Sequence, residues 1–126
     1  TEDVTYQEAG EYVGIKKLVD DFYDIMNELK ESEGIRNMHP DDLEVSRDKL
    51  TRFLCAWTGG PRLYREKYGA ISIPQAPSHL SIGSTERDAW LLCMKKALSK
   101  QDYPEDFQQY MITQLAVPAE RCRNQD

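Results

Sequence analysis

Apolar residues recur along much of this chain at intervals of three and four positions, the spacing that places them on one face of a helix. The first such run spans several turns and predicts a long helix that ends near Gly34. Its apolar positions are Ile15, Leu18, Val19, Phe22, Tyr23, Met26 and Leu29. A continuous stripe of this kind indicates one buried face and one face turned to solvent.

A second helix is expected after the sequence HPDD, residues 39–42. Proline suits the first turn of a helix, and aspartate suits the positive end of the helix dipole. The sequence TGGP, residues 58–61, should end this helix, because Gly59 can adopt the backbone conformation that closes a helix. The predicted inner face consists of Leu43, Ser46, Leu50, Phe53, Leu54 and Trp57. Ser46 is the one polar residue on that face.

The remaining sequence predicts a short helix over 61–69, then a loop, then two longer helices. A loop is expected over 70–83, because this segment contains two prolines and few helix formers. The next helix should take Ser84 or Thr85 as its N-terminal cap. Its predicted inner face is Trp90, Cys93, Met94, Ala97 and Leu98. The last helix, from about Pro104 to Ala116, should present Phe107, Tyr110, Met111 and Leu115.

These patterns predict an all-α fold. The longest stretch that alternates like a strand is AISI, residues 70–73. We expect one domain over residues 1–126, with an N-terminal extension at 1–10 and a polar C-terminal tail at 117–126.

Composition narrows the possible partners. The chain carries a net charge of −6 and is 40% hydrophobic, which is typical of a folded globular domain. It lacks the clustered Lys and Arg that nucleic-acid binding requires. No apolar run approaches the roughly 20 residues of a membrane span, and the first residues do not resemble a signal peptide. We therefore expect a cytoplasmic monomer that binds neither nucleic acid nor membrane.

The three cysteines are widely spaced and form no zinc-binding pattern with either histidine. A disulfide framework is not expected either, since such frameworks occur in short, cysteine-dense secreted chains. Cys55 and Cys93 lie in helical patterns and should be small buried apolar residues. Cys122 lies in the polar tail.

Few residues of the sequence are candidates for catalysis or ligand binding. The motifs of serine hydrolases, zinc proteases and phosphate-binding loops are absent. Taken singly, Tyr23 and Trp90 are typical core aromatics and His39 is typical of a helix cap. Taken together, His79 in a proline-broken loop and these three polar side chains in an apolar helical cage indicate a haem pocket. A neutral imidazole is the usual proximal ligand of haem iron, and polar distal groups tune its ligand binding.

Three segments resemble the truncated haemoglobins of the second group: LVDDFYDIM, HPDDLEVSRDKLTRFLCAWTGGPRLYREKYG and SHLSIGSTERDAWLLCMKKAL. The resemblance extends from about Tyr6 to Leu115. It implies a shortened globin in which two helices pack over two around haem b. The short element and loop before His79 agree with the reduced proximal region of that family.

The resemblance also implies roles for individual residues. His79 matches the proximal iron ligand, Tyr23 and Trp90 match distal residues, and His39 stands where relatives often carry Tyr or Phe. Lys49 would point towards a haem propionate. The residues expected to line the haem are Ser46, Lys49, Leu50, Phe53, Leu54, Tyr64, Ile82 and Met94.

The implied function is reversible binding of O2, NO and CO. Three distal hydrogen-bonding groups should slow O2 release, which favours redox chemistry or detoxification of O2, NO or peroxide over bulk oxygen transport. Turnover would be NO dioxygenase-like or peroxidase-like and would need a reductase. Two alternatives stay open. Tyr23 or His39 could itself coordinate ferric iron, or the chain could be an all-α interaction or sensor module without functional haem.

Overall fold

The computed structural model describes residues 3–70 and 83–121, and every regular element in these ranges is helical. The elements are α1 (Val4–Glu8), α2 (Glu11–Glu28), the 3-10 helix η1 (Lys30–Ser32), α3 (Glu33–Arg36), α4 (Glu44–Trp57), α5 (Leu63–Tyr68), α6 (Ser84–Ser99) and α7 (Glu105–Arg121). The all-α prediction is confirmed.

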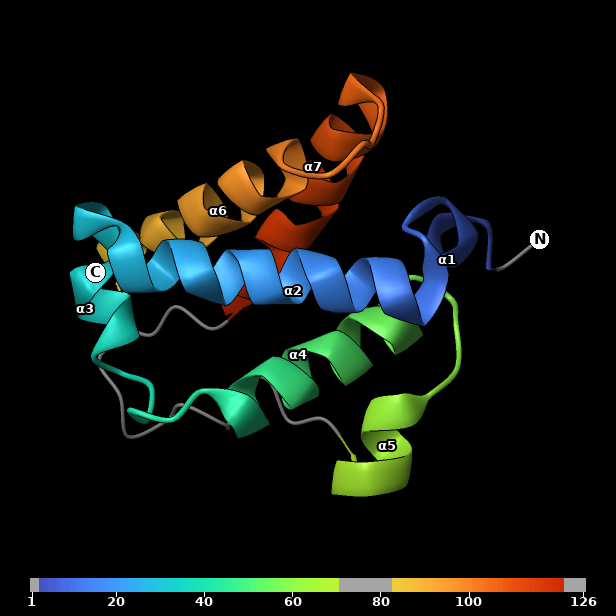
Figure 1. Ribbon diagram of the computed structural model, residues 1–126, viewed down its shortest axis with the longest axis horizontal. Coiled ribbons are helices and arrows are strands. Elements are labelled where there is room, and N and C mark those ends of the chain that lie inside the picture. The colour runs from blue at the N-terminus through green and yellow to red at the C-terminus, as the bar shows by residue number, and fades with distance from the viewer. Residues whose placement is uncertain (1–2, 71–82, 122–126) are drawn as a thin grey trace.

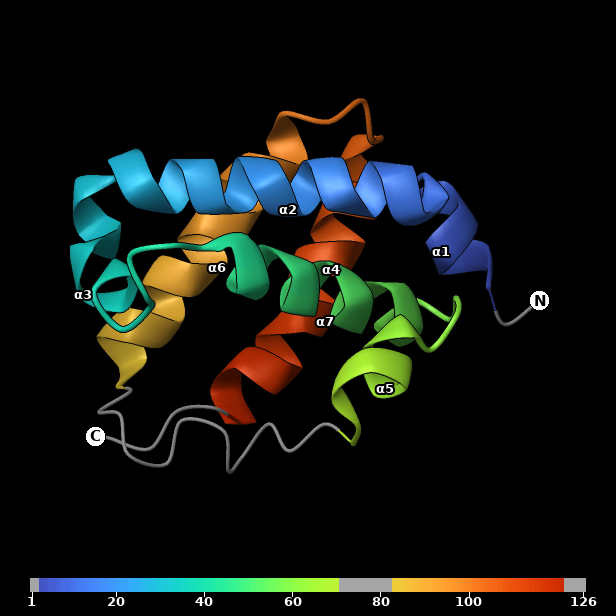
Figure 2. The same cartoon turned by 60° about the horizontal axis from the view of Figure 1, so that its bottom comes forward.

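Two pairs of helices form two layers. Helix α2 packs against both α4 and α6, α6 packs against α7, and α4 packs against α5. Figure 1 shows α2 crossing the middle of the molecule between α6 and α4. Figure 2 shows α2 and α4 in front of α6 and α7. This is the two-over-two arrangement expected from the sequence.

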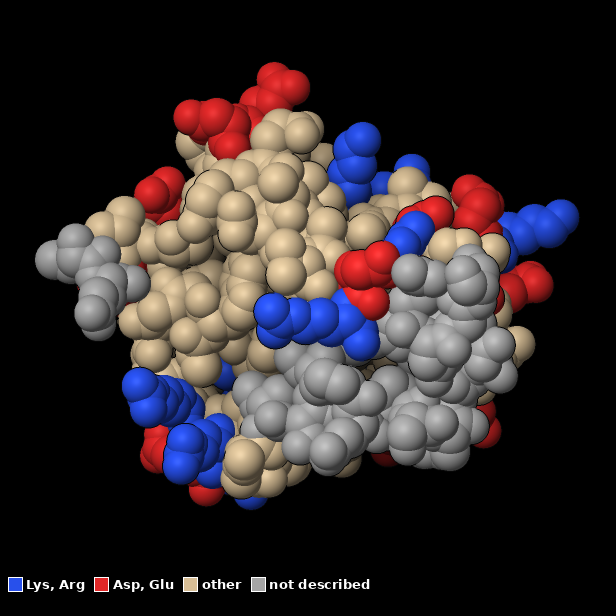
Figure 3. Space-filling model, turned by 180° about the vertical axis from the view of Figure 1, so that it is seen from behind, with Lys and Arg blue, Asp and Glu red and all other residues tan. Residues whose placement is uncertain are grey.

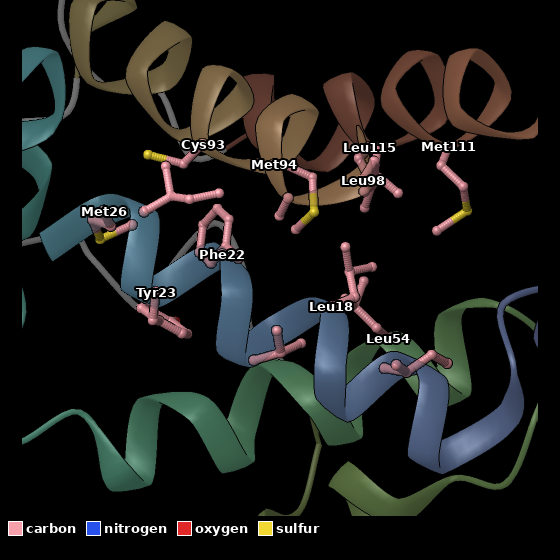
Figure 4. Close-up of a cluster of buried hydrophobic side chains, with 14 of the residues drawn as sticks. Leu18, Phe22, Tyr23, Met26, Leu54, Cys93, Met94, Leu98, Met111 and Leu115 are labelled. Carbon is pink, nitrogen blue, oxygen red and sulfur yellow. The ribbon is translucent and has the colours of Figure 1, made fainter. Parts of the chain in front are cut away.

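The core lies between these layers and consists mainly of residues from the predicted stripes. Phe22 and Leu18 of α2 face Met94 and Leu98 of α6, and all four are almost completely buried (Figure 4). Full burial of one such side chain contributes about 1.5–3 kcal/mol. Several positions of the predicted inner faces are less buried than expected. Tyr110 is 49% exposed, and the following are only half-buried: Leu29, Ser46, Leu50, Phe53, Trp57 and Trp90.

The first long helix does not reach Gly34 as predicted. Helix α2 ends at Glu28, because Leu29 adopts an extended conformation with ψ 123°. The buried Ser32 hydroxyl lies 2.7 Å from the carbonyl oxygens of both Met26 and Leu29. A polar side chain therefore satisfies carbonyl groups at the helix end, and the chain turns into η1 and α3.

Other boundaries follow the sequence more closely. Helix α4 begins directly after the predicted entry segment, and Gly59, at φ 94°, follows its end. Helix α6 is capped by Gly83 rather than by Ser84 or Thr85, and the Gly83 amide donates to Glu86 Oε1 at 2.8 Å. A Glu in the first turn thus satisfies the preceding amide.

Both predicted ends of the domain contain helix. Helix α1 lies within the predicted extension at 1–10, and α7 continues past Ala116 to Arg121. Tyr103 attaches the first segment to the body by donating to the Ala9 carbonyl at 2.7 Å. The N-terminal segment is therefore packed structure, and residues 117–121 extend the last helix.

Cys55 and Cys93 are free and buried, as predicted. Burial raises the pKa of the Cys55 thiol to about 11 and also raises that of Cys93. Cys122 lies outside the described residues. No helix in the described ranges combines the length and apolar character of a membrane span. On the face in Figure 3, basic and acidic side chains are interspersed around a broad uncharged area.

Candidate functional site

Three of the predicted site residues are linked by a chain of aromatic contacts that passes through Phe22. Phe22 of α2 contacts Trp90 of α6 and its own neighbour Tyr23, with ring centroids 5.1 and 4.9 Å apart. Tyr23 then contacts His39, which follows α3, at 5.7 Å. All three contacts are edge-to-face, the geometry that aromatic rings prefer. The fold therefore joins residues from three separate segments into one aromatic row.

Tyr23 is 4% exposed, and the described hydrogen bonds do not include its hydroxyl; no enclosed side-chain polar atom of the described residues is left without a partner. Burial raises the pKa of this hydroxyl far above its ordinary value of 10, so the group stays protonated at neutral pH. A buried phenol usually finds a partner. Tyr23 therefore offers a hydrogen-bond donor to a ligand in this region.

His39 is held by the backbone of α3. Its Nδ1 lies 2.9 Å from the Ile35 carbonyl oxygen, and since a carbonyl can only accept, Nδ1 carries the proton. Burial lowers the pKa of the imidazole, so the ring is neutral near pH 7. Its Nε2 is therefore a hydrogen-bond acceptor, and a neutral His39 cannot donate from that nitrogen. Among the three residues predicted to lie on the distal side, the hydrogen-bond donors are Tyr23 and Trp90, whose indole N–H can only donate.

One face of α4 is only partly covered by protein. Ser46, Leu50, Phe53 and Trp57 follow one another at helical spacing and are all half-buried, whereas Leu54 behind them is fully buried. Partial exposure of three large apolar side chains on a single face is unfavourable in water. A flat, largely apolar group such as a porphyrin fits this face.

The other predicted contact residues divide into three groups. Met94, like Leu54, is completely buried in the core (Figure 4). Tyr64 is half-buried on α5. The ammonium of Lys49, on α4, lies 5.2 Å from the ring centroid of Tyr68, which is also on α5. His79 and Ile82 lie outside the described residues.

Sequence reasoning missed two residues of this region. Phe22 was recognised only as part of an apolar stripe, although it separates Tyr23 from Trp90. Arg47 was not considered, although its guanidinium lies 5.7 Å from the ring centroid of Tyr23. A signal for Arg47 was present, since helical spacing places Asp20 and Asp24 one turn apart on one face of α2.

Comparison with known proteins agrees with this geometry. The family model described as bacterial-like globin matches residues 4–123. The chain is 28% identical over 120 residues to the group 2 truncated haemoglobin YjbI of Bacillus subtilis, covering 95% of this chain and 88% of that protein.

Solved structures extend the comparison. The group II 2-on-2 haemoglobin from Agrobacterium tumefaciens superposes with a TM-score of 0.91 at 31% identity, covering 100% of this chain and 98% of that one. A structure described as a truncated oxygen-avid haemoglobin from Bacillus subtilis has a TM-score of 0.85 at 27% identity, covering 95% and 98%. The chain therefore belongs to the bacterial-like globin family, within its group II truncated haemoglobins.

Proposed function

We propose that this globin holds haem b against the half-buried face of α4, with His79 as the axial ligand of the iron. Membership of the globin family implies a haem cofactor and the binding of diatomic ligands. The partly exposed Leu50, Phe53 and Trp57 support the position, because a porphyrin would cover them. Ser46 belongs to the same face, and half-buried Tyr64 lies on α5, which packs against α4.

The haem would supply a ferrous iron able to bind O2, NO or CO. The protein would supply the hydrogen bonds around that ligand. Tyr23 O–H and Trp90 N–H would donate, each contributing on the order of 1 kcal/mol, and Nε2 of neutral His39 would accept from a nearby hydroxyl or water. The single observation that carries this proposal is the row Trp90–Phe22–Tyr23–His39, which joins these polar side chains from α6, α2 and the segment after α3.

We infer further that slow ligand release adapts the protein to redox chemistry or detoxification rather than to bulk oxygen transport. Two directed donors favour retention of O2, and the description of the Bacillus subtilis relative as oxygen-avid is in keeping with this. NO dioxygenase-like conversion of O2 and NO to nitrate consumes one electron, which a reductase would supply. A peroxidase-like reaction is the second candidate. The monomeric state and the cytoplasmic location stay predictions.

The first test is haem binding by the protein and by two histidine variants. We expect the haemin-reconstituted protein to show a sharp Soret band that shifts when CO is added to the ferrous form. His79→Ala should degrade this spectrum, whereas His39→Ala, the matched control, should retain a His-ligated spectrum. If the wild type binds no haem, or binds it identically without His79, the interaction-module or sensor alternative takes its place.

A further inference from the structure

Arg47 joins α4 to α2 directly beside Tyr23. Its Nη1 donates to the Asp20 carbonyl oxygen at 3.0 Å and lies 3.2 Å from Asp20 Oδ1, and its Nη2 donates to Asp24 Oδ1 at 2.8 Å. These partners precede and follow Tyr23 on the same helix. The Arg47 side chain is only 24% exposed, which is low for a charged group at a helix–helix junction.

The same guanidinium contacts the Tyr23 ring. Its central carbon lies 5.7 Å from the ring centroid, within cation–π range. Phe22 and His39 contact this ring as well. Among the described contacts of the Tyr23 ring, Arg47 is the one that comes from α4, the helix that carries the proposed haem-facing surface.

We propose that Arg47 is a positioning residue for Tyr23: by fastening α4 to α2 across the tyrosine ring, it holds the Tyr23 hydroxyl in the orientation that meets the ligand. This inference rests on the proposed haem function. A guanidinium makes several hydrogen bonds in a fixed planar geometry, which a lysine ammonium cannot reproduce. The planar set of N–H donors of the guanidinium (the planar fork), and not its charge alone, therefore fixes the distance between α2 and α4 at this point.

The effect of losing Arg47 on ligand release, compared with its effect on the melting temperature, distinguishes this role from a purely structural one. Partly exposed ion pairs contribute little to global stability, so loss of Arg47 should hardly change the melting temperature. A donor displaced by even a few tenths of an ångström loses much of its hydrogen bond. Ligand retention should therefore change far more than stability does.

The test is a double-mutant cycle on the haem-reconstituted ferrous protein. We expect Arg47→Met to accelerate O2 dissociation about fivefold, the value of one hydrogen bond, and to shift the C–O stretching frequency of the CO form. In a Tyr23→Phe background the same change should have no further effect, because Arg47 acts through Tyr23. An equal acceleration in both backgrounds, or none in either, would overturn the proposal.

Two further variants control for charge and for folding. Lys16→Met removes another cation that pairs with Asp20, 3.2 Å away on the exposed side of α2, and should leave the O2 rate unchanged. Arg47→Lys keeps the charge without the planar fork and should behave like Arg47→Met; a wild-type rate would contradict positioning. If Arg47→Met does not fold, Asp24→Ala removes the acceptor of one of these hydrogen bonds and should accelerate release in the same direction.

A measurement on the haem-free protein separates this inference from the proposed function. In protein with isotope-labelled tyrosine, the Tyr23 ring signals are identified by their loss in Tyr23→Phe. Arg47→Met should shift these signals and increase the rate of ring flipping, whereas Lys16→Met should not. If the protein binds no haem, the proposed function fails, and unchanged Tyr23 signals in Arg47→Met would still refute the positioning role.

Discussion

The Tyr23 ring meets the His39 ring edge-on, with 5.7 Å between the centroids, and the two side chains offer opposite hydrogen-bonding groups. Tyr23 presents a protonated hydroxyl. His39 presents a lone pair on Nε2, because its Nδ1 proton is used on the Ile35 carbonyl. The sequence allowed both Tyr23 and His39 to donate, and the structure leaves Tyr23 as the donor of this pair.

This difference predicts a ranking of variants. Tyr23→Phe and Trp90→Phe should each accelerate O2 dissociation about fivefold, which corresponds to the loss of about 1 kcal/mol. His39→Phe should have a smaller effect at neutral pH, because the imidazole cannot donate to the ligand. Stopped-flow displacement of O2 by CO measures all three rates. A larger effect for His39→Phe than for Tyr23→Phe would show that His39 donates directly.

The same variants test the open question of ferric coordination. If Tyr23 or His39 occupies the sixth position of ferric iron, the ferric absorption spectrum should change in Tyr23→Phe or in His39→Ala. The two side chains contact each other and would compete for one position on the iron. The ferric spectrum of one variant should therefore change more than that of the other. A ferric spectrum that ignores both substitutions argues against coordination by either residue.

His39 should make stability depend on pH in the weakly acidic range. Burial lowers its pKa in the folded protein below the ordinary value of 6.5. The folded state thus binds fewer protons than the unfolded state in this range, and stability increases with pH. The contribution of neutral His39 is complete above about pH 6.5 and is lost as the pH falls through the folded-state pKa. Melting temperatures from pH 7.5 to 5 should fall less steeply for His39→Phe than for the wild type; parallel curves would contradict this.

Asp48 should anchor α5 to α4. Its carboxylate accepts from Tyr68 Oη at 2.6 Å, Lys67 Nζ at 2.9 Å and Arg52 Nε at 3.0 Å. Burial alone would raise the pKa of Asp48, but these three hydrogen bonds outweigh it and lower the pKa to about 2. The resulting stability is present above about pH 4 and is lost as the pH falls through about 2.

Asp48→Asn should therefore reduce the free energy of unfolding at pH 7 by about 1 kcal/mol. The difference from wild type should shrink between pH 4 and pH 2.5. Urea unfolding at several pH values measures both effects. Asp102→Asn, on the exposed turn after α6, is the control and should change little at any pH. A penalty for Asp48→Asn that is the same at every pH would mean that the charge is not its cause.

Two helical glycines should respond oppositely to alanine. A methyl group on Gly14 would overlap the carbonyl oxygen of Ala9, which also accepts the hydrogen bond from Tyr103. Gly14→Ala should cost about 1–3 kcal/mol of stability, as forced overpacking does. On exposed Gly34 the nearest atom is Glu86 Oε2 at 3.8 Å, so Gly34→Ala should be neutral or stabilise by up to about 1 kcal/mol. Chemical denaturation distinguishes the two, and equal effects would contradict the packing argument.

Much of the fold could be predicted from periodicity alone. The stripe from Ile15 to Met26 is almost continuously buried, and the start of α4 lies where HPDD predicted it. The misplaced features depend on contacts that periodicity does not contain. Helix α2 ends before Gly34 because the hydroxyl of Ser32 reaches back to its carbonyls, and Tyr110 stays 49% exposed because it lines an open cleft beside the end of α4 and is not packed in the core.

The sequence by itself determined the class of this protein, because helical periodicity, loop-breaking residues and the motifs around Tyr23, Trp90 and His79 are local properties of the chain. Only the tertiary structure decided which hydrogen-bonding group each predicted distal side chain presents and which residues contact it. The Ile35 carbonyl assigns the His39 proton, Phe22 separates Trp90 from Tyr23, and Arg47 reaches across from α4. Hydrogen-bond direction and ring contact depend on distances between residues far apart in the chain, and folding alone sets those distances.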